Sequence, residues 1–224
     1  MENYLIKNMY TLSESMAGEY LEKFDYPWEA VPSIGSIISM LIDELDMDRF
    51  EKWGENVYIA KSVKVAETAT IIGPTIIDED TEVRPGAYIR GNAIVGKNCV
   101  VGNSCELKNV ILFNNVQVPH YNYVGDSILG YKAHMGAGSI TSNFKCDHSN
   151  VVLHFGSNNI VTGQRKMGAM LGDHVEIGCN SVLNPGTIIG RNAFVYPLSC
   201  VRGFIPSESI YKGKEDIVFR SDSF

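Results

Sequence analysis

The fold class that the sequence predicts is mainly β: a solenoid of short parallel strands, preceded by an N-terminal helical segment. Three observations lead to it. Aliphatic residues recur every six positions over most of the chain, small residues recur at a fixed place between them, and the segment 1–56 lacks this repeat and is strongly acidic. The 224 residues are 45% hydrophobic and 20% charged, a composition typical of a folded globular protein rather than a disordered or fibrous one.

Residues 1–56 form the acidic N-terminal segment. They hold 12 acidic and 4 basic side chains, whereas the formal net charge of the whole chain is −7. Thr11 and Glu14 have the spacing of a capping box, which predicts a short helix from there to about Phe24. Apolar residues at helical spacing predict a second helix over 33–45. We expect this segment to pack across one end of the solenoid, where it would cover unpaired strand edges.

From Ile59 onwards the hydrophobic pattern has a period of six. Neither the 3.6-residue period of a helix nor the two-residue period of a strand produces this step. With one five-residue step before Leu112 and another before Leu129, the aliphatic positions are Ile59, Val65, Ile71, Ile77, Val83, Ile89, Val95, Val101, Leu107, Leu112, Val118, Val124, Leu129, Met135, Leu171, Ile177, Leu183, Ile189, Val195 and Val201. Three hexads make one triangular coil, so this series predicts six to seven coils around a continuous aliphatic column.

The repeat is interrupted once and stops before the C-terminus. It lapses between Ile140 and Leu171, so residues 141–169 are expected to form an inserted loop that projects from one face. The repetitive domain spans residues 57–206. Residues 207–224 carry no hexads and are expected to form an extended C-terminal tail.

Charge and composition exclude several classes of function. A formal net charge of −7 and a pI near 5.2 argue against a nucleic-acid partner, which needs a basic face. No apolar run approaches the roughly 20 residues of a membrane helix, and the N-terminus has no signal-peptide core. Five cysteines, an odd number without a CxxC pair, favour a reducing compartment. We therefore expect a cytoplasmic protein without a membrane partner.

His120 has the strongest chemical context of the five histidines. It lies two positions after the inward-facing Val118 and is expected on an outward face, with Tyr123 on the same outer surface. Arg84 and Lys108 are separated by one coil and one hexad, so we expect them on adjacent faces of adjacent coils. Two cations, a tyrosine and a histidine around one cleft suit a phosphorylated polar substrate that loses a proton.

Four motifs, in this order, resemble those of a known family. They are RPGA (84–87), ELK (106–108), H-x-x-Y-x-G-D (120–126) and GAGSITSNF (136–144). On these motifs the chain resembles the hexapeptide-repeat left-handed β-helix acyltransferases, and specifically the acetyltransferase half of the bifunctional enzyme of UDP-N-acetylglucosamine synthesis. The similarity covers about residues 57–206. It implies left-handed coils, acetyl-CoA as acyl donor and N-acetylation of glucosamine-1-phosphate.

The resemblance also implies roles for individual residues, with His120 as the catalytic base. The substrate-binding residues that it implies are Arg84, Lys108, Tyr123, Asn143, Phe144 and His134. The residues that it implies near acetyl-CoA are Ala137, Lys166 and Cys179. His134 stands where the family has an asparagine, Phe144 where it has a tyrosine, and the loop that follows is longer. The nucleotidyltransferase half has no counterpart here, so uridylyltransferase activity is not expected.

The expected function is acetyl-CoA-dependent N-acetylation of an amino sugar phosphate, with direct transfer to the amine and no metal. The resemblance implies a homotrimer whose acetyl-CoA site lies between neighbouring prisms. One alternative is a non-catalytic trimer that binds a nucleotide sugar or regulates a partner. Another is a γ-carbonic-anhydrase-like metal enzyme, which uses a close pair of histidines at a five-residue step; here the nearest spacings are 148/154 and 120/134.

Overall fold

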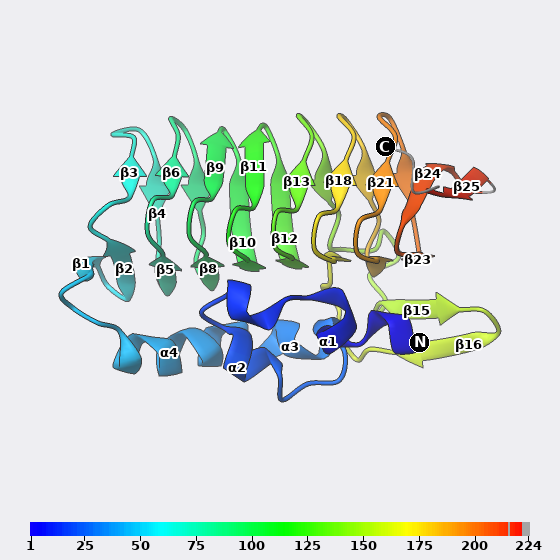
Figure 1. Cartoon of the computed structure of the whole chain (residues 1–224), viewed down its shortest axis with the longest axis horizontal. Coiled ribbons are helices and arrows are strands. Elements are labelled where there is room, and N and C mark those ends of the chain that lie inside the picture. The colour runs from blue at the N-terminus through cyan, green and yellow to red at the C-terminus, as the bar shows by residue number, and fades with distance from the viewer. Residues whose placement is uncertain (215, 221–224) are drawn as a thin grey trace.

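The structure is a computed structural model that describes residues 1–214 and 216–220. The chain forms a parallel β-solenoid, and short helices run along one side of it (Figure 1). Each coil has three faces joined by three corners, and the strands of a face pair with those of the coils before and after. The mainly β fold that the six-residue period predicts is therefore confirmed.

The first face is the one that the helices cover. Its parallel strands, in hydrogen-bonded order, are β2 (Val57–Ala60), β5 (Thr75–Ile77), β8 (Ala93–Val95), β10 (Glu106–Leu112), β12 (Tyr123–Leu129), β17 (Ala169–Leu171), β20 (Thr187–Ile189) and β23 (Phe204–Ile205). β10 and β12 turn a corner, so their first halves belong to the third face.

The other two faces are open on the outside within the described part of the chain. The second face consists of β3 (Lys64–Val65), β6 (Glu82–Val83), β9 (Val100–Asn103), β11 (Gln117–His120), β13 (His134–Met135), β18 (Glu176–Ile177), β21 (Phe194–Val195) and β24 (Ser209–Gly213). The third face consists of β4 (Thr70–Ile71), β7 (Tyr88–Ile89), the first halves of β10 and β12, β14 (Ile140–Thr141), β19 (Val182–Leu183) and β22 (Cys200–Val201).

Both ends of the solenoid carry an antiparallel strand. β1 (Phe50–Gly54) pairs with β2, and β25 (Asp216–Phe219) pairs with β24. β24 lies within 207–224, the stretch expected to be a tail, and the first two faces hold eight parallel strands each rather than six to seven coils. The inward column continues from Val201 to Ile205 with a step of only four positions, which hides the last strands from a six-residue count. Residues 215 and 221–224 of the expected tail lie outside the described residues.

Left-handed backbone conformations turn the chain at the corners. At the corner between the first and second faces, φ lies between 53° and 61° at Asp80, Asn98, Asn115, Lys132, His174, Asn192 and Glu208. Asparagine and aspartate tolerate this conformation better than other residues with a side chain. Four of these seven corner residues are asparagine or aspartate, whereas Lys132, His174 and Glu208 adopt the same conformation with longer side chains.

The N-terminal segment contains the helices of the described chain. They are η1 (Glu2–Tyr4), α1 (Ile6–Met9), η2 (Leu12–Glu14), α2 (Gly18–Leu21), α3 (Pro27–Ala30), η3 (Val31–Ser33) and α4 (Ile34–Glu44). The helix predicted over 33–45 is confirmed as α4. Thr11 caps no helix; instead its hydroxyl donates to Asp173 in the solenoid at 2.7 Å. None of these helices combines the length and the apolar character that crossing a membrane requires.

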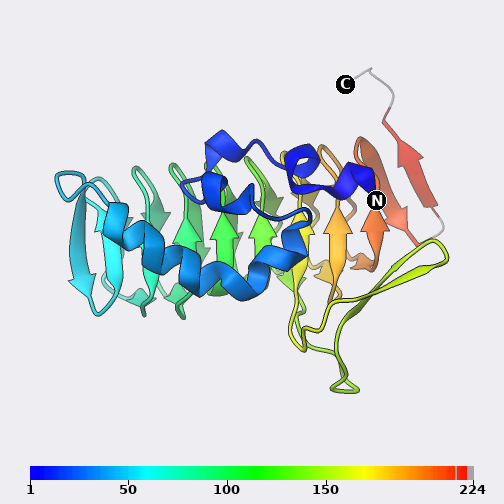
Figure 2. The same ribbon diagram turned by 90° about the horizontal axis from the view of Figure 1, so that it is seen from below.

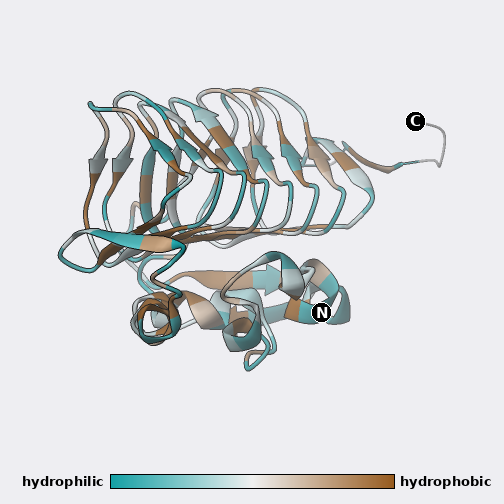
Figure 3. Cartoon of the chain, turned by 60° about the vertical axis from the view of Figure 1, so that its left-hand side comes forward, coloured by the Kyte–Doolittle hydropathy of each residue, from teal (hydrophilic) through white to brown (hydrophobic). Residues whose placement is uncertain are grey.

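The expectation that this segment covers one end of the solenoid is wrong, because it lies along the first face (Figure 2). The physical reason is a second, outward-facing row of apolar side chains on that face. Each of its members is completely buried: Ile76, Ile94, Ile111, Ile128, Met170 and Ile188. Hydrophobic segments recur at the same place in successive coils (Figure 3). The helices remove this row from water, and burial of one such side chain contributes about 1.5–3 kcal/mol.

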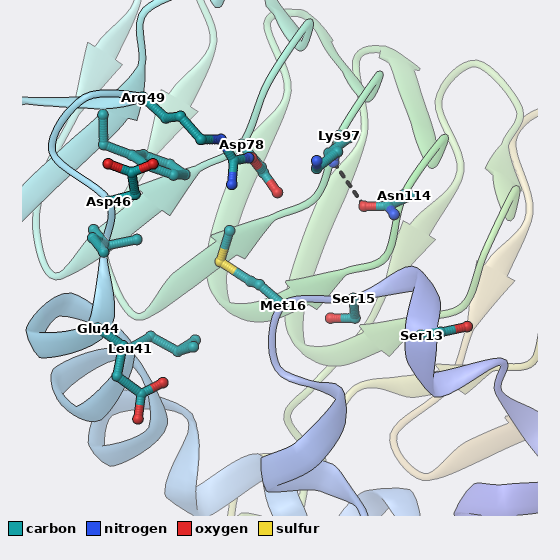
Figure 4. A pocket seen from close by; sticks show the side chains of 12 residues that line it. Ser13, Ser15, Met16, Leu41, Glu44, Asp46, Arg49, Asp78, Lys97 and Asn114 are labelled. Atoms are coloured by element: carbon teal, nitrogen blue, oxygen red, sulfur yellow. Dashed lines mark hydrogen bonds and ion pairs between the residues drawn. The ribbon is translucent and has the colours of Figure 1, made fainter.

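A cavity of about 340 Å³ remains at the seam between the N-terminal segment and the solenoid (Figure 4). Arg49 contacts Asp78 at 3.3 Å and Glu79 at 2.8 Å, and Lys97 contacts Glu79 at 2.8 Å. Hydrogen bonds from Arg49 and Lys97 lower the pKa of Glu79 to about 2, whereas burial raises the pKa of Asp78. Ion pairs thus fasten the end of the segment to the corner between the first and second faces.

Residues 142–168, called the insertion below, leave the solenoid between β14 and β17. They form a hairpin of β15 (Val152–Phe155) and β16 (Asn158–Val161), which projects from the solenoid. The Phe155 ring packs against Phe204 with centroids 4.9 Å apart and against Tyr4 at 5.9 Å. The turn end of the hairpin is therefore held by both the solenoid and the N-terminal segment.

Candidate functional site

The outer surface of the third face is where the predicted site residues begin to meet. Tyr123 opens β12 there, with Glu106 beside it in the coil before and Ile140 in the coil after. Burial raises the pKa of the Tyr123 hydroxyl, and the charge of nearby Asp126 raises it further. Tyr123 therefore stays protonated at neutral pH and offers a hydroxyl on this surface.

A buried carboxylate organises the residues around Tyr123. Asp126, at the corner between the third and first faces, is 3% exposed. Lys108 Nζ contacts its Oδ1 at 2.8 Å, and Asn109 Nδ2 donates to the same oxygen at 2.9 Å. Asn143 Nδ2 donates to the other carboxylate oxygen and to the Tyr123 hydroxyl, the latter at 3.0 Å. We call these five residues the third-face cluster.

Gly125 is required for the geometry of this cluster. A Cβ atom on it would lie 2.4 Å from the Tyr123 hydroxyl and 2.9 Å from Asn143 Nδ2. Contacts this short do not occur, so any side chain at this position would displace the hydroxyl and the amide. The glycine in the motif H-x-x-Y-x-G-D thus has a steric explanation.

Arg90 is a cation that the sequence reasoning missed. It occupies the same corner as Lys108 one coil earlier, because Ile89 pairs with Leu107, and it contacts Glu106 at 2.6 Å. Its separation from Lys108 by three hexads, one full coil, was the signal that could have identified it.

Arg84 is not brought into the third-face cluster. It lies at the corner between the second and third faces, at the opposite end of the third face from Lys108, and its guanidinium contacts Glu82 on the second face at 3.2 Å. The two cations do lie in adjacent coils, as expected. They flank the third face instead of meeting, because one coil plus one hexad moves a residue along a whole face.

His120 lies at the corner between the second and third faces, at the end of β11, with its side chain exposed. Its backbone N–H donates to Asn122 Oδ1 at 3.0 Å, and its carbonyl accepts from the Gly138 N–H at 2.9 Å. Tyr121, the next residue, has φ of 52° and is 65% exposed, a conformation that a bulky side chain rarely adopts. The corner therefore fixes the backbone on both sides of an imidazole that faces outward.

Ala137 and Cys179 continue the corner position of His120 in the next two coils. The Gly138 N–H donates to the His120 carbonyl, and in the same way the Asn180 N–H donates to the Ala137 carbonyl at 2.9 Å. Successive strands in a sheet are about 4.8 Å apart, so the three side chains form one column about 10 Å long. The structure brings together the expected base and the two positions that the resemblance implies for acetyl-CoA.

His134 lies away from this column and from the third-face cluster. It is on the second face, where its Nδ1 contacts Glu176 Oε2 at 2.8 Å. Its imidazole therefore already has a partner on that face.

Phe144 and Lys166 face each other across the root of the insertion. They form an isolated antiparallel bridge, and the Arg165 guanidinium lies 5.7 Å from the centre of the Phe144 ring. The Met167 N–H donates to the Asn143 carbonyl at 2.9 Å. The two ends of the insertion are thus joined beside the third-face cluster.

Two of the cysteines fill the core, and the described residues contain no group of side chains suited to a metal ion. Cys99 and Cys105 are buried, and burial raises the pKa of Cys99 to about 12. Over residues 1–214 and 216–220, no three histidine, cysteine, aspartate or glutamate side chains are grouped so that they could hold a metal ion.

Comparison with known proteins gives a match to a protein-family model. The model is described as "GMPPB C-terminal domain" and matches residues 71–193. The bifunctional protein GlmU of Methanocaldococcus jannaschii is 32% identical over 200 residues, 87% of this chain and 48% of that protein. The bifunctional sugar-1-phosphate nucleotidylyltransferase/acetyltransferase of Sulfurisphaera tokodaii is 31% identical over 166 residues, 65% of this chain and 41% of that protein. The chain thus spans about half the length of these curated relatives.

Solved structures with a similar chain path include a hexapeptide transferase family protein from Anaplasma phagocytophilum. It has a TM-score of 0.42 and 14% identity, and the match covers 74% of this chain and 81% of that one. Another is PerB from Caulobacter crescentus, solved in complex with CoA and GDP-perosamine, with a TM-score of 0.35 and 15% identity over 74% of this chain and 57% of that one.

Proposed function

The chain belongs to the GMPPB C-terminal domain family, and from that premise we propose that it transfers the acetyl group of acetyl-CoA to the amine of an amino sugar phosphate. The proposal is supported by a relative whose name combines nucleotidylyltransferase and acetyltransferase. One observation carries it: an exposed histidine, His120, stands in one column with Ala137 and Cys179 and borders the face that holds the third-face cluster.

The proposed mechanism is direct transfer. His120 removes a proton from the substrate ammonium, and the free amine attacks the thioester carbonyl. The C–S bond then breaks, and the departing CoA thiolate takes up the second proton that the nitrogen loses. The N–H groups of Gly136 and Gly138 already donate to carbonyls within the solenoid, at 2.7 and 2.9 Å. The N–H of Ala137, between these two glycines, makes no hydrogen bond within residues 1–214 and 216–220, and we propose it as the donor that stabilises the oxyanion. No metal takes part in the proposed reaction.

The test is release of free thiol from acetyl-CoA. We expect release with glucosamine-1-phosphate and not without an acceptor, together with a product about 42 Da heavier than the acceptor by mass spectrometry, since an acetyl group replaces a proton in the transfer step. Absence of transfer with any amino sugar phosphate would favour the alternative, a trimer that binds a nucleotide sugar without catalysis. His134 and Phe144, which replace an asparagine and a tyrosine of the family that the motifs resemble, are the residues that favour this alternative.

We propose that Lys108 and Arg90 hold the phosphate, since they occupy the same corner in adjacent coils. Lys108→Ala and Arg90→Ala are each expected to weaken binding of the sugar phosphate by about 1.5–3 kcal/mol, the range for a hydrogen bond to a charged group. Binding of acetyl-CoA should stay unchanged. Isothermal titration calorimetry with each ligand measures both effects.

Arg84→Ala is the matched control for these two substitutions, because Arg84 is an equally ion-paired cation at the other end of the third face. If Arg84→Ala weakens binding of the sugar phosphate as much as Arg90→Ala does, the phosphate lies at the corner of His120. If any variant loses binding of both the sugar phosphate and acetyl-CoA, the substitution has damaged the solenoid.

We also propose that the protein is a homotrimer in which copies meet through the second and third faces. The N-terminal segment of the same chain already covers the first face. Tyr121 and Leu198, at the corner of His120, are 65% and 79% exposed, which is a large apolar surface to leave in water. Sedimentation equilibrium at micromolar concentration is expected to give three times the chain mass; a monomer would argue against a site shared between copies.

A further inference from the structure

The corner between the second and third faces has one inward position per coil, and its residue is small in all but one of the described coils. The position lies four residues after the inward aliphatic residue of the second face. Strand pairing aligns it through the coils, where it is occupied by Ala69, Ala87, Cys105, Asn122, Ser139, Ser181 and Ser199. Asn122 is 2% exposed. The exception is thus a buried amide, and it stands in the coil that carries His120.

The side chain of Asn122 joins its own coil to the next one. Its Oδ1 accepts a hydrogen bond from the backbone N–H of His120 at 3.0 Å. Its Nδ2 donates to the carbonyls of Gly136 and Ser139 in the following coil, at 2.8 and 3.0 Å. Both halves of the buried amide are therefore satisfied, and they connect the backbone of His120 with the corner that contains Ala137.

The peptide bond between Pro119 and His120 is turned over relative to the matching peptide bond in another coil. A Cβ atom on Gly102, in the coil before, would overlap the carbonyl oxygen of Pro119. On Gly136, the matching residue in the coil after, the same atom would lie 2.7 Å from the peptide nitrogen of Cys179. The Pro119 carbonyl therefore faces Gly102, and the N–H of His120 faces the inside of the solenoid, where the amide oxygen accepts it.

In other coils a serine stabilises the ordinary orientation of this peptide bond. The Ser139 hydroxyl donates to the carbonyl of Gly136, and the Ser199 hydroxyl donates to that of Tyr196, at 2.6 and 2.7 Å. In each case the carbonyl lies three residues earlier and faces the inside of its own coil. The carbonyl of Pro119 faces away, so the inward N–H needs an acceptor instead of a donor. The amide oxygen of the asparagine provides it.

We propose that Asn122 is a positioning residue for acetyl transfer. It holds the peptide bond before His120 in its turned-over orientation and so sets the direction of the imidazole relative to the Ala137 N–H, the proposed oxyanion donor. The side chain is buried, so it acts through the backbone of His120. A general base must lie within hydrogen-bonding reach of the proton that it removes, and a displacement of about 1 Å can lower turnover about 10²-fold. The inference rests on the proposed function for the role of His120.

The first test is Asn122→Ser. Serine occupies this position in other coils, so the solenoid should fold, and the hydroxyl allows the Pro119 carbonyl to turn inward as the Gly136 carbonyl does. Because the imidazole is then redirected, turnover of acetyl transfer should fall at least about tenfold. Affinities for glucosamine-1-phosphate and acetyl-CoA, measured by calorimetry, should change by less than about twofold, since the base contributes to the transition state. Full turnover in Asn122→Ser would overturn the inference.

The same substitution in the His120→Ala background separates positioning from a structural role. Once the imidazole is removed, no base is left to position, so Asn122→Ser should change the residual turnover by less than about twofold. A residue that only supports the fold would lower turnover by the same factor in both backgrounds. That result would show that Asn122 does not act through His120.

Thr81→Val is the matched control. Thr81 is completely buried at the corner between the first and second faces. Its hydroxyl donates to the carbonyl of Gly96 in the next coil at 2.7 Å and accepts from the Cys99 N–H at 2.9 Å. The substitution removes buried hydrogen bonds between coils away from the candidate site, so thermal stability should fall while turnover stays within about twofold of the wild type. If turnover falls as much as in Asn122→Ser, lost stability explains both effects and the inference is wrong.

Hydrogen exchange at the His120 amide tests the geometry without catalysis. In the wild type this amide should exchange at least about 100-fold more slowly than in an unstructured peptide. Asn122→Ser should raise the rate at least about tenfold, because the N–H loses its acceptor, and Thr81→Val should leave it unchanged. Rapid exchange in the wild type would overturn the inference even if Asn122→Ser did not fold. Absence of acetyl transfer with any amino sugar phosphate would refute the proposed function, and the exchange rates would then decide by themselves whether Asn122 orients His120.

Discussion

Replacing His120 by alanine is expected to lower the turnover of acetyl transfer by about 10²–10⁴-fold, the usual contribution of a general base. The side chain is exposed, and its backbone hydrogen bonds do not depend on the imidazole. Thermal stability should therefore change by no more than about 0.5 kcal/mol. Steady-state kinetics with saturating acetyl-CoA, together with thermal unfolding, measures the two effects separately.

His134→Ala is the control for this experiment. It removes a second, partly exposed histidine, whose partner is Glu176 on the second face, and should leave turnover nearly unchanged. If His134→Ala abolishes turnover and His120→Ala does not, the general base lies on the second face, and the proposal that His120 is the base is wrong.

Replacing Asp173 by alanine is expected to cost about 3 kcal/mol of unfolding free energy, the lower end of the range for breaking a buried ion pair. Asp173 is completely buried and accepts four hydrogen bonds. Two come from Thr11, at 2.8 Å from its N–H and 2.7 Å from its hydroxyl; one comes from the Tyr131 N–H at 2.9 Å, and one from Arg191. Arg191 is partly exposed and regains water, which keeps the loss at the lower end.

Chemical denaturation measures this loss, and Glu176→Ala is the matched control. Glu176 also contacts a side chain in the same part of the solenoid, the imidazole of His134, but it is exposed, and exposed pairs contribute about 0–1 kcal/mol. Hydrogen exchange should show the backbone around Thr11 opening in Asp173→Ala at low denaturant. A loss below about 1 kcal/mol, the size of a surface pair, would mean that Asp173 does not anchor the N-terminal segment.

The solenoid itself could be predicted from the sequence because its cause is local. Every coil repeats one inward aliphatic residue per face and one turn residue per corner, so a window one coil long contains the whole rule. The last strands were not predicted by the six-residue period, because a four-residue step separates Val201 from Ile205. The fold continued while the period did not.

The position of the helices could not be predicted from the same period. The outward row on the first face, such as Ile76 and Ile94, stands next to inward residues and merges with them into short apolar runs. A run of this kind predicts burial on both sides of a strand without identifying what covers the outer side. From the sequence alone, the acidic segment could cover either the end of the solenoid or one of its faces, and the hydrophobic pattern did not distinguish the two.

The candidate site could be predicted only in part, because some of its features depend on contacts between coils and on the path of the insertion. His120, Tyr123 and Lys108 were identified from residue type and spacing, and the structure puts Tyr123 and Lys108 around Asp126. Arg90 and the contact of Phe144 with Lys166 were missed. Arg90 becomes informative only when positions one coil apart are compared, and that contact depends on the path of the insertion, which no repeat governs.

The placement of the N-terminal segment has a consequence for how the protein unfolds. A stack of coils in which each touches only its neighbours can fray from either end, coil by coil. Here the segment binds coils far apart: Asn109 Nδ2 donates to the Val31 carbonyl, Tyr10 packs on Phe113, and Tyr4 packs on Phe204 near the last coil. Unfolding of a terminal coil therefore also removes contacts of the N-terminal segment, and this weakens the binding of the segment to the central coils. The N-terminal segment thus couples the coils into one cooperative unit. We expect this unit to unfold in a single transition, whereas a solenoid without the segment would unfold in several steps.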